Sequence, residues 1–316
     1  MQSTTFHSVH EAWRGILQQI KSVGECVPGT VDALSVGSAF GEQARDYVEL
    51  LGASITVEAP RDRLVNSEAR SISPAFLLAN VIYAMSGSDD LSRIIHYNSR
   101  GTPFSDDGAT LPNALGKRLC GLDTIDQFSA CRSLLERDPS SRRAVVSLYS
   151  PDDAGSPSRD CPCLLHLHFL KRGDTLSCVV GVRSQSAAML FPYDAFLVSM
   201  LQESMAVSLD AELGPLIFHF GSLHYYVDEE ALVDLVLSES LPYPACMPPM
   251  KQAASDVLTE LISAEEAIRT HGTLPAGLAL DDYWRVYLKA LRAAAQSRDS
   301  SLTPVDVEQS CFSYLF

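Results

Sequence analysis

The sequence predicts an α/β protein of the α+β type, in which strands lie at the centre and helices lie outside. The first observation is composition, because 46% of the 316 residues are hydrophobic and only 20% are charged, a balance typical of a packed core. The second is hydrophobic spacing, which changes between helical and strand-like periods along the chain. We expect one domain over residues 1–316, with a helical C-terminal part from about residue 227.

The N-terminal part of the chain contributes two helices and a strand to this pattern. Apolar residues at helical spacing predict a helix over Val9–Val23. Residues 47–58 favour a strand, with Gly52 as a bulge or turn. Ser73-Pro74 begins a strongly apolar helix over residues 75–85, because proline in the first turn of a helix loses no hydrogen bond. We expect that helix to be buried.

The same criteria assign the remaining elements. Residues 99–113 and 151–160 are rich in Ser, Asp, Gly and Pro, which predicts loops. Strand-like runs occupy residues 144–149, 164–170, 176–182 and 216–220. Helices are expected over residues 123–136, 194–207, 229–237, 252–270 and 281–296.

Charge and cysteine content exclude several classes of function. A formal net charge of −15 argues against nucleic acid polymers and anionic membranes as partners, because no overall positive field attracts them. No apolar run approaches the roughly 18 residues that span a bilayer, and the first residues lack the features of a secretion signal. Eight cysteines without a disulfide-like framework fit reduced thiols. The expected compartment is the cytoplasm.

Reactive and anion-binding side chains gather in the stretch 161–226. They are Cys161-Pro162-Cys163, Arg183-Ser184, Pro192-Tyr193-Asp194, His224 and Tyr226. A thiol is a nucleophile only as the thiolate, which a neighbouring arginine favours, and guanidinium groups match phosphate oxygens. Together these residues could bind and attack a pyrimidine nucleotide.

The order and separation of these motifs resemble the thymidylate synthase superfamily. The landmarks are Asp138-Pro-Ser-Ser-Arg-Arg143, Cys161-Pro-Cys163, Val182-Arg183-Ser184, Pro192-Tyr-Asp194 and Phe220-Gly-Ser-Leu-His-Tyr-Tyr226. The resemblance implies a three-layer fold with a central mixed sheet and outer helices. It also implies a homodimer whose nucleotide site is completed across the subunit interface.

The resemblance also implies a role for each landmark residue. Cys163 would add to pyrimidine C6, and the phosphate would be bound by Arg183 and Ser184. The following residues would complete the substrate site: Arg142 and Arg143 from the partner subunit, His224 and Tyr226 at the sugar 3′-hydroxyl, and Arg45 as a further phosphate ligand.

Asp194 is the residue that would select the base. Thymidylate synthases resemble one another in having asparagine here, whereas a carboxylate suits the 4-amino donor of cytosine. The motif therefore resembles the cytidylate and deoxycytidylate hydroxymethylase branch most. Cytosine N3 is an acceptor, so a protonated Asp194 or a bridging water must complete the pairing.

The side of the site that would bind folate departs from the family pattern. Asn80 stands where the catalytic carboxylate is expected, and an amide cannot relay a proton as a carboxylate does. Ser186 and Leu190 replace the expected Asp and Gly, and residues 113–115 lack the expected tyrosine. Neither tryptophan lies where the folate-stacking indoles belong. Use of methylenetetrahydrofolate is therefore the least supported part of the resemblance.

Simpler interpretations of the same residues stay open. Cys163 could be a small buried strand residue, Arg142 and Arg143 solvated surface groups, and Asp194 a helix N-cap. His224 and Tyr226 could belong to the core. A metal site of Cys161, Cys163, His166 and His168 is disfavoured, because strand alternation places the cysteines and histidines on opposite faces.

Three functions remain at this point. The first is folate-dependent C5 hydroxymethylation of CMP or dCMP, serving modified nucleoside or antibiotic synthesis. The second is another reaction of the Cys163 adduct without folate, and the third is a catalytically silent nucleotide-binding protein.

Overall fold

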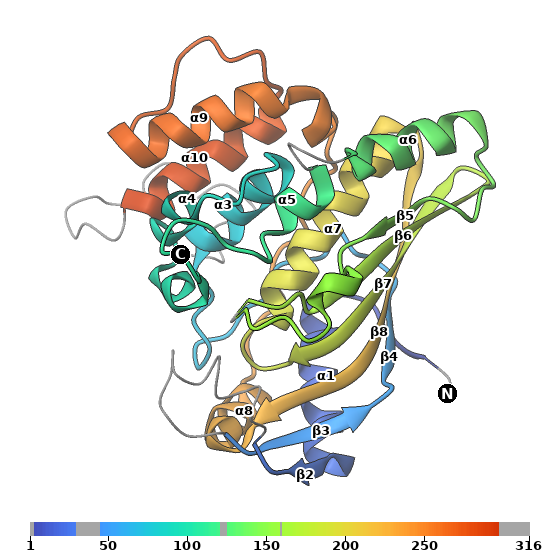
Figure 1. Ribbon diagram of the computed structural model, residues 1–316, viewed down its shortest axis with the longest axis vertical. Coiled ribbons are helices and arrows are strands. Elements are labelled where there is room, and N and C mark those ends of the chain that lie inside the picture. The colour runs from blue at the N-terminus through green and yellow to red at the C-terminus, as the bar shows by residue number, and fades with distance from the viewer. Residues whose placement is uncertain (1–2, 30–44, 121–124, 159, 297–316) are drawn as a thin grey trace.

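The computed structural model describes residues 3–29, 45–120, 125–158 and 160–296 (Figure 1). These residues form a mixed sheet of eight strands, with helices packed beside it. The strands are β1 (Thr4–Phe6), β2 (Glu25–Val27), β3 (Tyr47–Leu51), β4 (Ser54–Val57), β5 (Val145–Ser147), β6 (Leu164–Arg172), β7 (Thr175–Ser186) and β8 (Glu212–Tyr226). The predicted α/β class with a central mixed sheet is confirmed.

The long strand β8 lies at the centre of the sheet. The strand order is β1-β4-β8-β7-β6-β5, and β3 also pairs with β8 while β2 pairs with β3. The β7–β8 and β1–β4 pairs are parallel, and the other pairs are antiparallel. Because β7 and β8 run side by side, residues 184–186 of β7 lie next to residues 222–224 of β8.

The helices pack in layers against this sheet (Figure 1). They are α1 (Val9–Val23), α3 (Pro74–Met85), α4 (Leu91–Ile95), α5 (Leu115–Cys120), α6 (Gln127–Arg137), α7 (Phe191–Ser208), α8 (Glu230–Ser238), α9 (Leu258–His271) and α10 (Asp282–Gln296). Helix α7 contacts β7 and β8, α3 packs on α7, and α9 and α10 pack on α3. None of the described helices combines the length and the hydrophobicity that a membrane crossing requires.

One cluster of buried hydrophobic residues extends from α1 to α10. Helix α7 is buried on nearly all sides, which explains its apolar sequence. Trp13 of α1 donates its indole N–H to the carbonyl of Ala187, 3.0 Å away, just before α7. The buried Glu203 of α7 is paired with Arg61 and Arg63. The first contact ties α1 to the segment just before α7, and the second anchors the C-terminal half of α7 to residues 61–63.

Most predicted elements occur near their expected positions. The bounds of α1 match the prediction, Ser73 caps α3, and Gly52 forms the turn between β3 and β4 with a φ of +63°. The predicted helix over residues 123–136 begins at Gln127, and residues 123–124 lie outside the described ranges. The short elements β1, β2, α4 and α5 had no clear signal in the sequence.

Two boundaries differ in ways that affect the site. Strand β8 extends over Glu212–Tyr226, well beyond the predicted residues 216–220, because pairing with β3 and β7 continues past Gly221. Helix α7 begins at Phe191, so the interpretation of Asp194 as its N-cap is wrong. Asp194 lies in the first turn of the helix instead, where a negative charge is favourable.

Candidate active site

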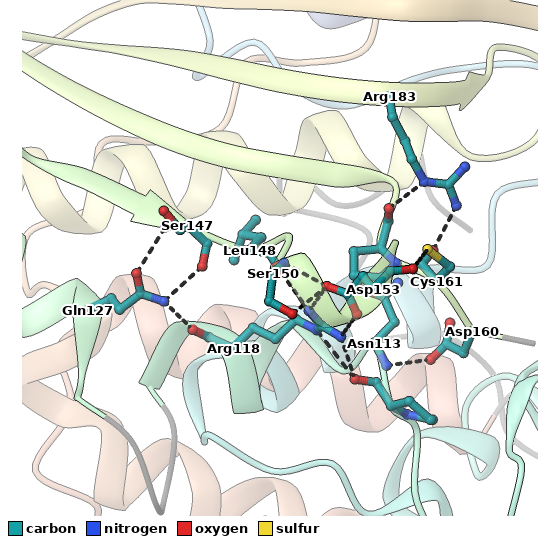
Figure 2. Close-up of polar contacts among 12 residues, drawn as sticks. Asn113, Arg118, Gln127, Ser147, Leu148, Ser150, Asp153, Asp160, Cys161 and Arg183 are labelled. Atoms are coloured by element: carbon teal, nitrogen blue, oxygen red, sulfur yellow. Dashed lines mark hydrogen bonds and ion pairs between the residues drawn. The ribbon is translucent and has the colours of Figure 1, made fainter. Parts of the chain in front are cut away.

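Cys163 lies at the end of a tight turn that leads into β6. Arg183 of β7 holds this turn at three points, and Figure 2 shows the two that its side chain makes. Its backbone N–H donates to the Cys163 carbonyl at 2.9 Å. Its guanidinium donates through Nε to the Pro162 carbonyl at 2.7 Å and through Nη2 to the Cys161 carbonyl at 3.0 Å. The arginine therefore positions the cysteine as well as contributing charge.

Cys163 is a partly exposed residue, although its thiol lies in largely buried surroundings. Burial raises the pKa of its thiol to about 11, and the carboxylates of Asp194 and Asp160 act in the same direction. The charge of Arg183 opposes them and lowers the pKa. Arg183 acts in the expected direction, toward the thiolate, but burial outweighs it. The free protein holds this cysteine as a neutral thiol at pH 7.

Asp194 lies close enough to Cys163 for its charge to act on the thiol. Burial raises the pKa of Asp194 to about 6, and a hydrogen bond from Gln185 opposes that shift. Gln185 Nε2 donates to Asp194 Oδ2 at 2.8 Å and connects the end of β7 with α7. The structure thus brings together Cys163, Arg183 and Asp194 from three separate elements.

His224 and Tyr226 occupy the end of β8. Their rings contact each other, with centroids 5.3 Å apart, and Tyr47 packs against His224 from β3. Burial and the charge of Arg45 lower the pKa of His224 to about 4, so its ring is neutral at pH 7. His224 Nδ1 is buried and has no hydrogen-bond partner among the described residues. The Tyr226 phenol lies near enough to Cys163 for the thiolate charge to raise the pKa of the phenol, although burial is the larger cause.

Arg45 is held by neighbouring side chains. It pairs with Asp228 and Glu229, and its guanidinium lies 3.8 Å above the centre of the Tyr226 ring. Two carboxylates therefore pair with the guanidinium of Arg45, which the sequence analysis predicted to be a further phosphate ligand. In this arrangement Arg45 supports Tyr226 and needs to leave its partners before it can bind an anion.

Arg142 and Arg143 lie at the opposite end of β6 from Cys163. They precede β5, whose Val145 pairs with His168, and the Arg142 carbonyl contacts the His168 ring at 3.1 Å. At roughly 3.3 Å per residue, five residues of strand separate them from Cys163 by about 17 Å or more. Both arginines are exposed, and neither guanidinium forms an ion pair within the described residues. One chain alone does not bring them to the cysteine.

The positions that would face folate carry few charged groups. Asn80 is half-buried on α3, and Leu190 is 48% exposed just before α7. The Ser186 hydroxyl is buried and unpaired within the described residues. Ser184, which was expected to bind the phosphate and not folate, is half-buried and lies opposite Ser222 of β8. Of these side chains, none provides a carboxylate.

A polar network, which the sequence pattern did not reveal, supports the cysteine turn (Figure 2). Asp160 accepts the backbone N–H of Asn113 at 2.8 Å. Arg118 pairs with Asp153 through two hydrogen bonds of 2.7 and 2.8 Å and also donates to the Leu148 carbonyl. Burial raises the pKa of Asp160 to about 6. These residues lie in loops and on a short helix, where spacing gives no signal of convergence.

Metal chemistry receives no support from this arrangement. In the part of the chain that the structure describes, no group of three or more His, Cys, Asp or Glu side chains is placed to hold a metal ion. The histidines His166 and His168 belong to β6 itself, whereas Cys161 and Cys163 precede the strand.

A half-buried cysteine beside an arginine, a carboxyl group and a His–Tyr pair is an arrangement suited to nucleophilic chemistry on a bound ligand. The chain belongs to the thymidylate synthase family, whose model matches residues 69–262. The matched region contains Cys163, Arg183, Asp194, His224 and Tyr226, while Arg45 lies outside it.

Individual relatives agree with this family membership. The chain is 27% identical over 206 residues to the deoxyuridylate hydroxymethyltransferase of Bacillus phage SP01, covering 61% of this chain and 54% of the relative. It is 33% identical over 121 residues to the thymidylate synthase of Bacillus licheniformis, covering 38% of this chain and 43% of the relative. The chain thus matches about half the length of these relatives.

Proposed function

We propose that this protein is a C5 hydroxymethylase of a cytosine nucleotide, CMP or dCMP, that acts through a covalent adduct of Cys163 at C6. The observation that carries the proposal is that the charge of a carboxyl group, Asp194, reaches the Cys163 thiol, as the charge of Arg183 does. A carboxylate at the base edge accepts the 4-amino hydrogens of cytosine, whereas the O4 of uracil offers no donor. The name of the phage relative specifies deoxyuridylate, so the choice of base is the part to test first.

The chemistry begins at the thiolate of Cys163. Its sulfur forms a bond to C6 of the ring, and the electron pair of the C5–C6 double bond makes C5 nucleophilic. Bound methylenetetrahydrofolate supplies the one-carbon unit in this proposal. C5 would form a bond to this carbon, and loss of the C5 proton with departure of tetrahydrofolate would then leave an exocyclic methylene on the ring. Water would add its oxygen to that methylene as the C6–S bond breaks, so the products are the 5-hydroxymethyl nucleotide, tetrahydrofolate and free Cys163.

The nucleotide has to activate this thiol, because burial keeps it protonated in the free protein. Binding of the base brings the ring C6 to the sulfur, so that the adduct traps the thiolate as it forms, and Arg183 supplies the nearby positive charge that stabilises the thiolate. We therefore propose that Arg183 both binds the phosphate of the nucleotide and stabilises the thiolate of Cys163.

The residues at the folate side fit the cofactor only in part. The unpaired Ser186 hydroxyl and the half-buried Asn80 amide can form hydrogen bonds, and the exposed Leu190 offers apolar surface. No carboxylate is present at these positions to relay a proton. This observation favours, as a second candidate, a reaction of the same C6 adduct that does not use folate.

We further propose that the protein acts as a homodimer. Arg142 and Arg143 are exposed, unpaired and distant from Cys163 of their own chain, so a second copy is needed to bring them to a nucleotide phosphate. The sheet face opposite the helices adds support, because Val179 and Ile217 are only half-buried there. A second sheet would cover them.

Release of tritium from C5-tritiated CMP and dCMP tests the function. Folate-dependent release with formation of a 5-hydroxymethyl product supports the hydroxymethylase. Release without folate supports the second candidate. No release, together with tight nucleotide binding, identifies a silent homologue.

A matched pair of variants assigns the nucleophile. Cys163→Ser should abolish release, whereas Cys161→Ser, two residues earlier in the same turn, should retain it. Full activity of Cys163→Ser would contradict the adduct mechanism.

A further inference from the structure

Gln185 and Asp194 form a polar pair at the end of β7. Gln185 is 1% exposed, and its Nε2 donates to Asp194 Oδ2 at 2.8 Å. The charge of Asp194 acts on the Cys163 thiol, so the pair borders the region in which the base would react. A glutamine facing the interior of a strand end is unusual unless its amide groups have partners.

The carbonyl oxygen of Gln185 lacks such a partner. Oε1 is buried and accepts no hydrogen bond from the described residues. Because an ionised carboxylate can only accept, the amide must direct its nitrogen toward Asp194, which leaves Oε1 as the free end. Oδ1 of Asp194 likewise accepts no hydrogen bond from the residues in the described ranges. Two acceptor oxygens of neighbouring side chains therefore lack donors among the described residues, and Gln185 Oε1 is closed to solvent in the free protein.

We propose that Gln185 Oε1 and Asp194 Oδ1 together accept the two N–H groups of the 4-amino substituent of a cytosine nucleotide. This inference rests on the proposed function. Cytosine satisfies both oxygens, whereas the O4 of uracil would add a third acceptor and leave both without donors. Gln185 thereby becomes a specificity-determining residue, and Asp194 does not select the base alone.

Gln202 of α7 provides a matched comparison within the same chain. It is also fully buried with an unpaired Oε1. Its Nε2, however, donates to the backbone carbonyls of Leu176 and Gly214 at 3.0 and 2.9 Å, so it ties the helix to the sheet. An unpaired amide oxygen alone does not identify a residue that recognises the base. The hydrogen bond to Asp194 beside Cys163 distinguishes Gln185.

The test compares three nucleotides on the full-length protein by calorimetry. CMP has the 4-amino group, UMP has a carbonyl, and the pyrimidin-2-one nucleotide has hydrogen at C4; each is used in ribo and deoxy form. Gln185→Met preserves the side-chain length but removes both polar atoms. This variant should lower the binding affinity for CMP about tenfold or more, which is the usual effect of losing a hydrogen bond to a ligand. The affinities for UMP and the pyrimidin-2-one nucleotide should change less than threefold.

Gln202→Met serves as the control, and it should leave the ratio of CMP to pyrimidin-2-one affinity unchanged even if it lowers the melting temperature. If Gln185→Met does not fold, Gln185→Asn gives the same comparison, because it keeps the amide but withdraws it by one methylene group.

The possible results separate the two proposals. Suppose that wild-type protein binds CMP more tightly than UMP, and that the Gln185 variant keeps the wild-type ratio of CMP affinity to pyrimidin-2-one nucleotide affinity. The proposed role of Gln185 as an acceptor is then wrong, but the assignment of cytosine as the base stands. If wild-type protein does not prefer CMP over UMP, the cytosine assignment fails and the acceptor pair fails with it. A selective loss of CMP affinity supports both.

Discussion

At Cys163, burial and two carboxylates shift the pKa of the thiol in one direction, and an arginine shifts it in the other. Burial, Asp194 and Asp160 raise the pKa of the thiol, and Arg183 lowers it. The result is a thiol that stays protonated, and is therefore a weak nucleophile, when no ligand is bound. Its reactivity should respond to single charge changes, because the thiolate fraction below the pKa changes tenfold per pKa unit.

Two substitutions should move this pKa in opposite directions. Arg183→Gln removes the favourable charge and should slow iodoacetamide labelling of Cys163 roughly three- to tenfold at pH 8. Asp160→Asn keeps a hydrogen-bond acceptor for Asn113 but removes a negative charge, so labelling should become faster. Peptide mass spectrometry measures the rate at Cys163 separately from the exposed Cys26 and Cys246.

Circular dichroism of both variants serves as the control for folding. Equal labelling rates in wild type and both variants would show that the two charges do not act on this thiol.

Residue type reveals only part of this site. Cysteine after proline, the Arg-Ser pair, Asp194 and the His–Tyr pair stand out because their chemistry is uncommon in a strand or at its end. Gln185 and Asp160 do not stand out, because a single amide in a strand and a carboxylate in a polar loop have many ordinary roles. Their importance depends on contacts between elements that lie far apart in the sequence.

At the scale of elements, the close approach of α5 to α3 depends on Gly116. A Cβ atom at this position would lie 2.8 Å from the Ala84 carbonyl oxygen and 2.9 Å from that of Tyr83. Both neighbours are backbone atoms of α3, so they cannot turn aside as a side chain can. The helix that carries Asn80 is therefore held in place partly by the absence of a side chain on α5.

Gly116→Ala should destabilise the protein by about 1–3 kcal/mol, because the helices must separate. Gly101→Ala is the control, since its Cβ would meet only ordinary contacts at 3.8 Å and should change stability by less than about 0.5 kcal/mol. Urea unfolding of both variants measures the difference. Equal stability of the two variants would contradict the proposed close packing.

Local pattern determined the elements with strong periodicity. Helices α1 and α3 have caps and apolar spacing that specify their bounds, and both agree with prediction. Strand β8 was predicted too short because polar residues and Gly221 interrupt its alternation. Neighbouring strands supply its remaining hydrogen bonds, and no local signal reports their presence.

At the scale of the whole molecule, His224 links folding to pH. Its pKa is about 4 in the folded protein, against 6.5 for an ordinary histidine. Between these values the unfolded chain binds a proton that the folded chain does not. The contribution of His224 to stability is therefore lost as pH falls from about 6.5 to about 4, by up to about 3 kcal/mol. His10 acts in the same direction, whereas Asp160 and Asp194, with pKa values of about 6, oppose it.

The His224→Gln variant isolates this contribution. The loss of ring contacts should lower stability at all pH values, but the variant should lose less further stability than wild type between pH 6.5 and pH 4. Urea unfolding at several pH values gives both curves. Parallel curves would show that His224 does not titrate on unfolding in this range.

Mixing two inactive variants tests the homodimer. Cys163→Ser lacks the nucleophile, and the double variant Arg142→Gln, Arg143→Gln lacks the arginines that we assign to the other subunit. Each alone should be nearly inactive. After mixing and subunit exchange, half of the dimers are mixed and each has one intact site, so about a quarter of wild-type activity should return.

If the double variant is inactive alone and mixing restores no activity, both arginines act in the site of their own subunit. Full activity of the double variant would remove them from the site.

The sequence by itself determined the family, the α/β class and the residue types of the candidate site, because uncommon side chains in a fixed order carry that information locally. Only the tertiary structure decided that burial outweighs Arg183 at the Cys163 thiol, that Asp228 and Glu229 hold Arg45, and that Gln185 joins Asp194. The physical reason is that pKa values and hydrogen bonds depend on which groups meet in space and on how much water they lose. Neither quantity is encoded at a single position of the chain.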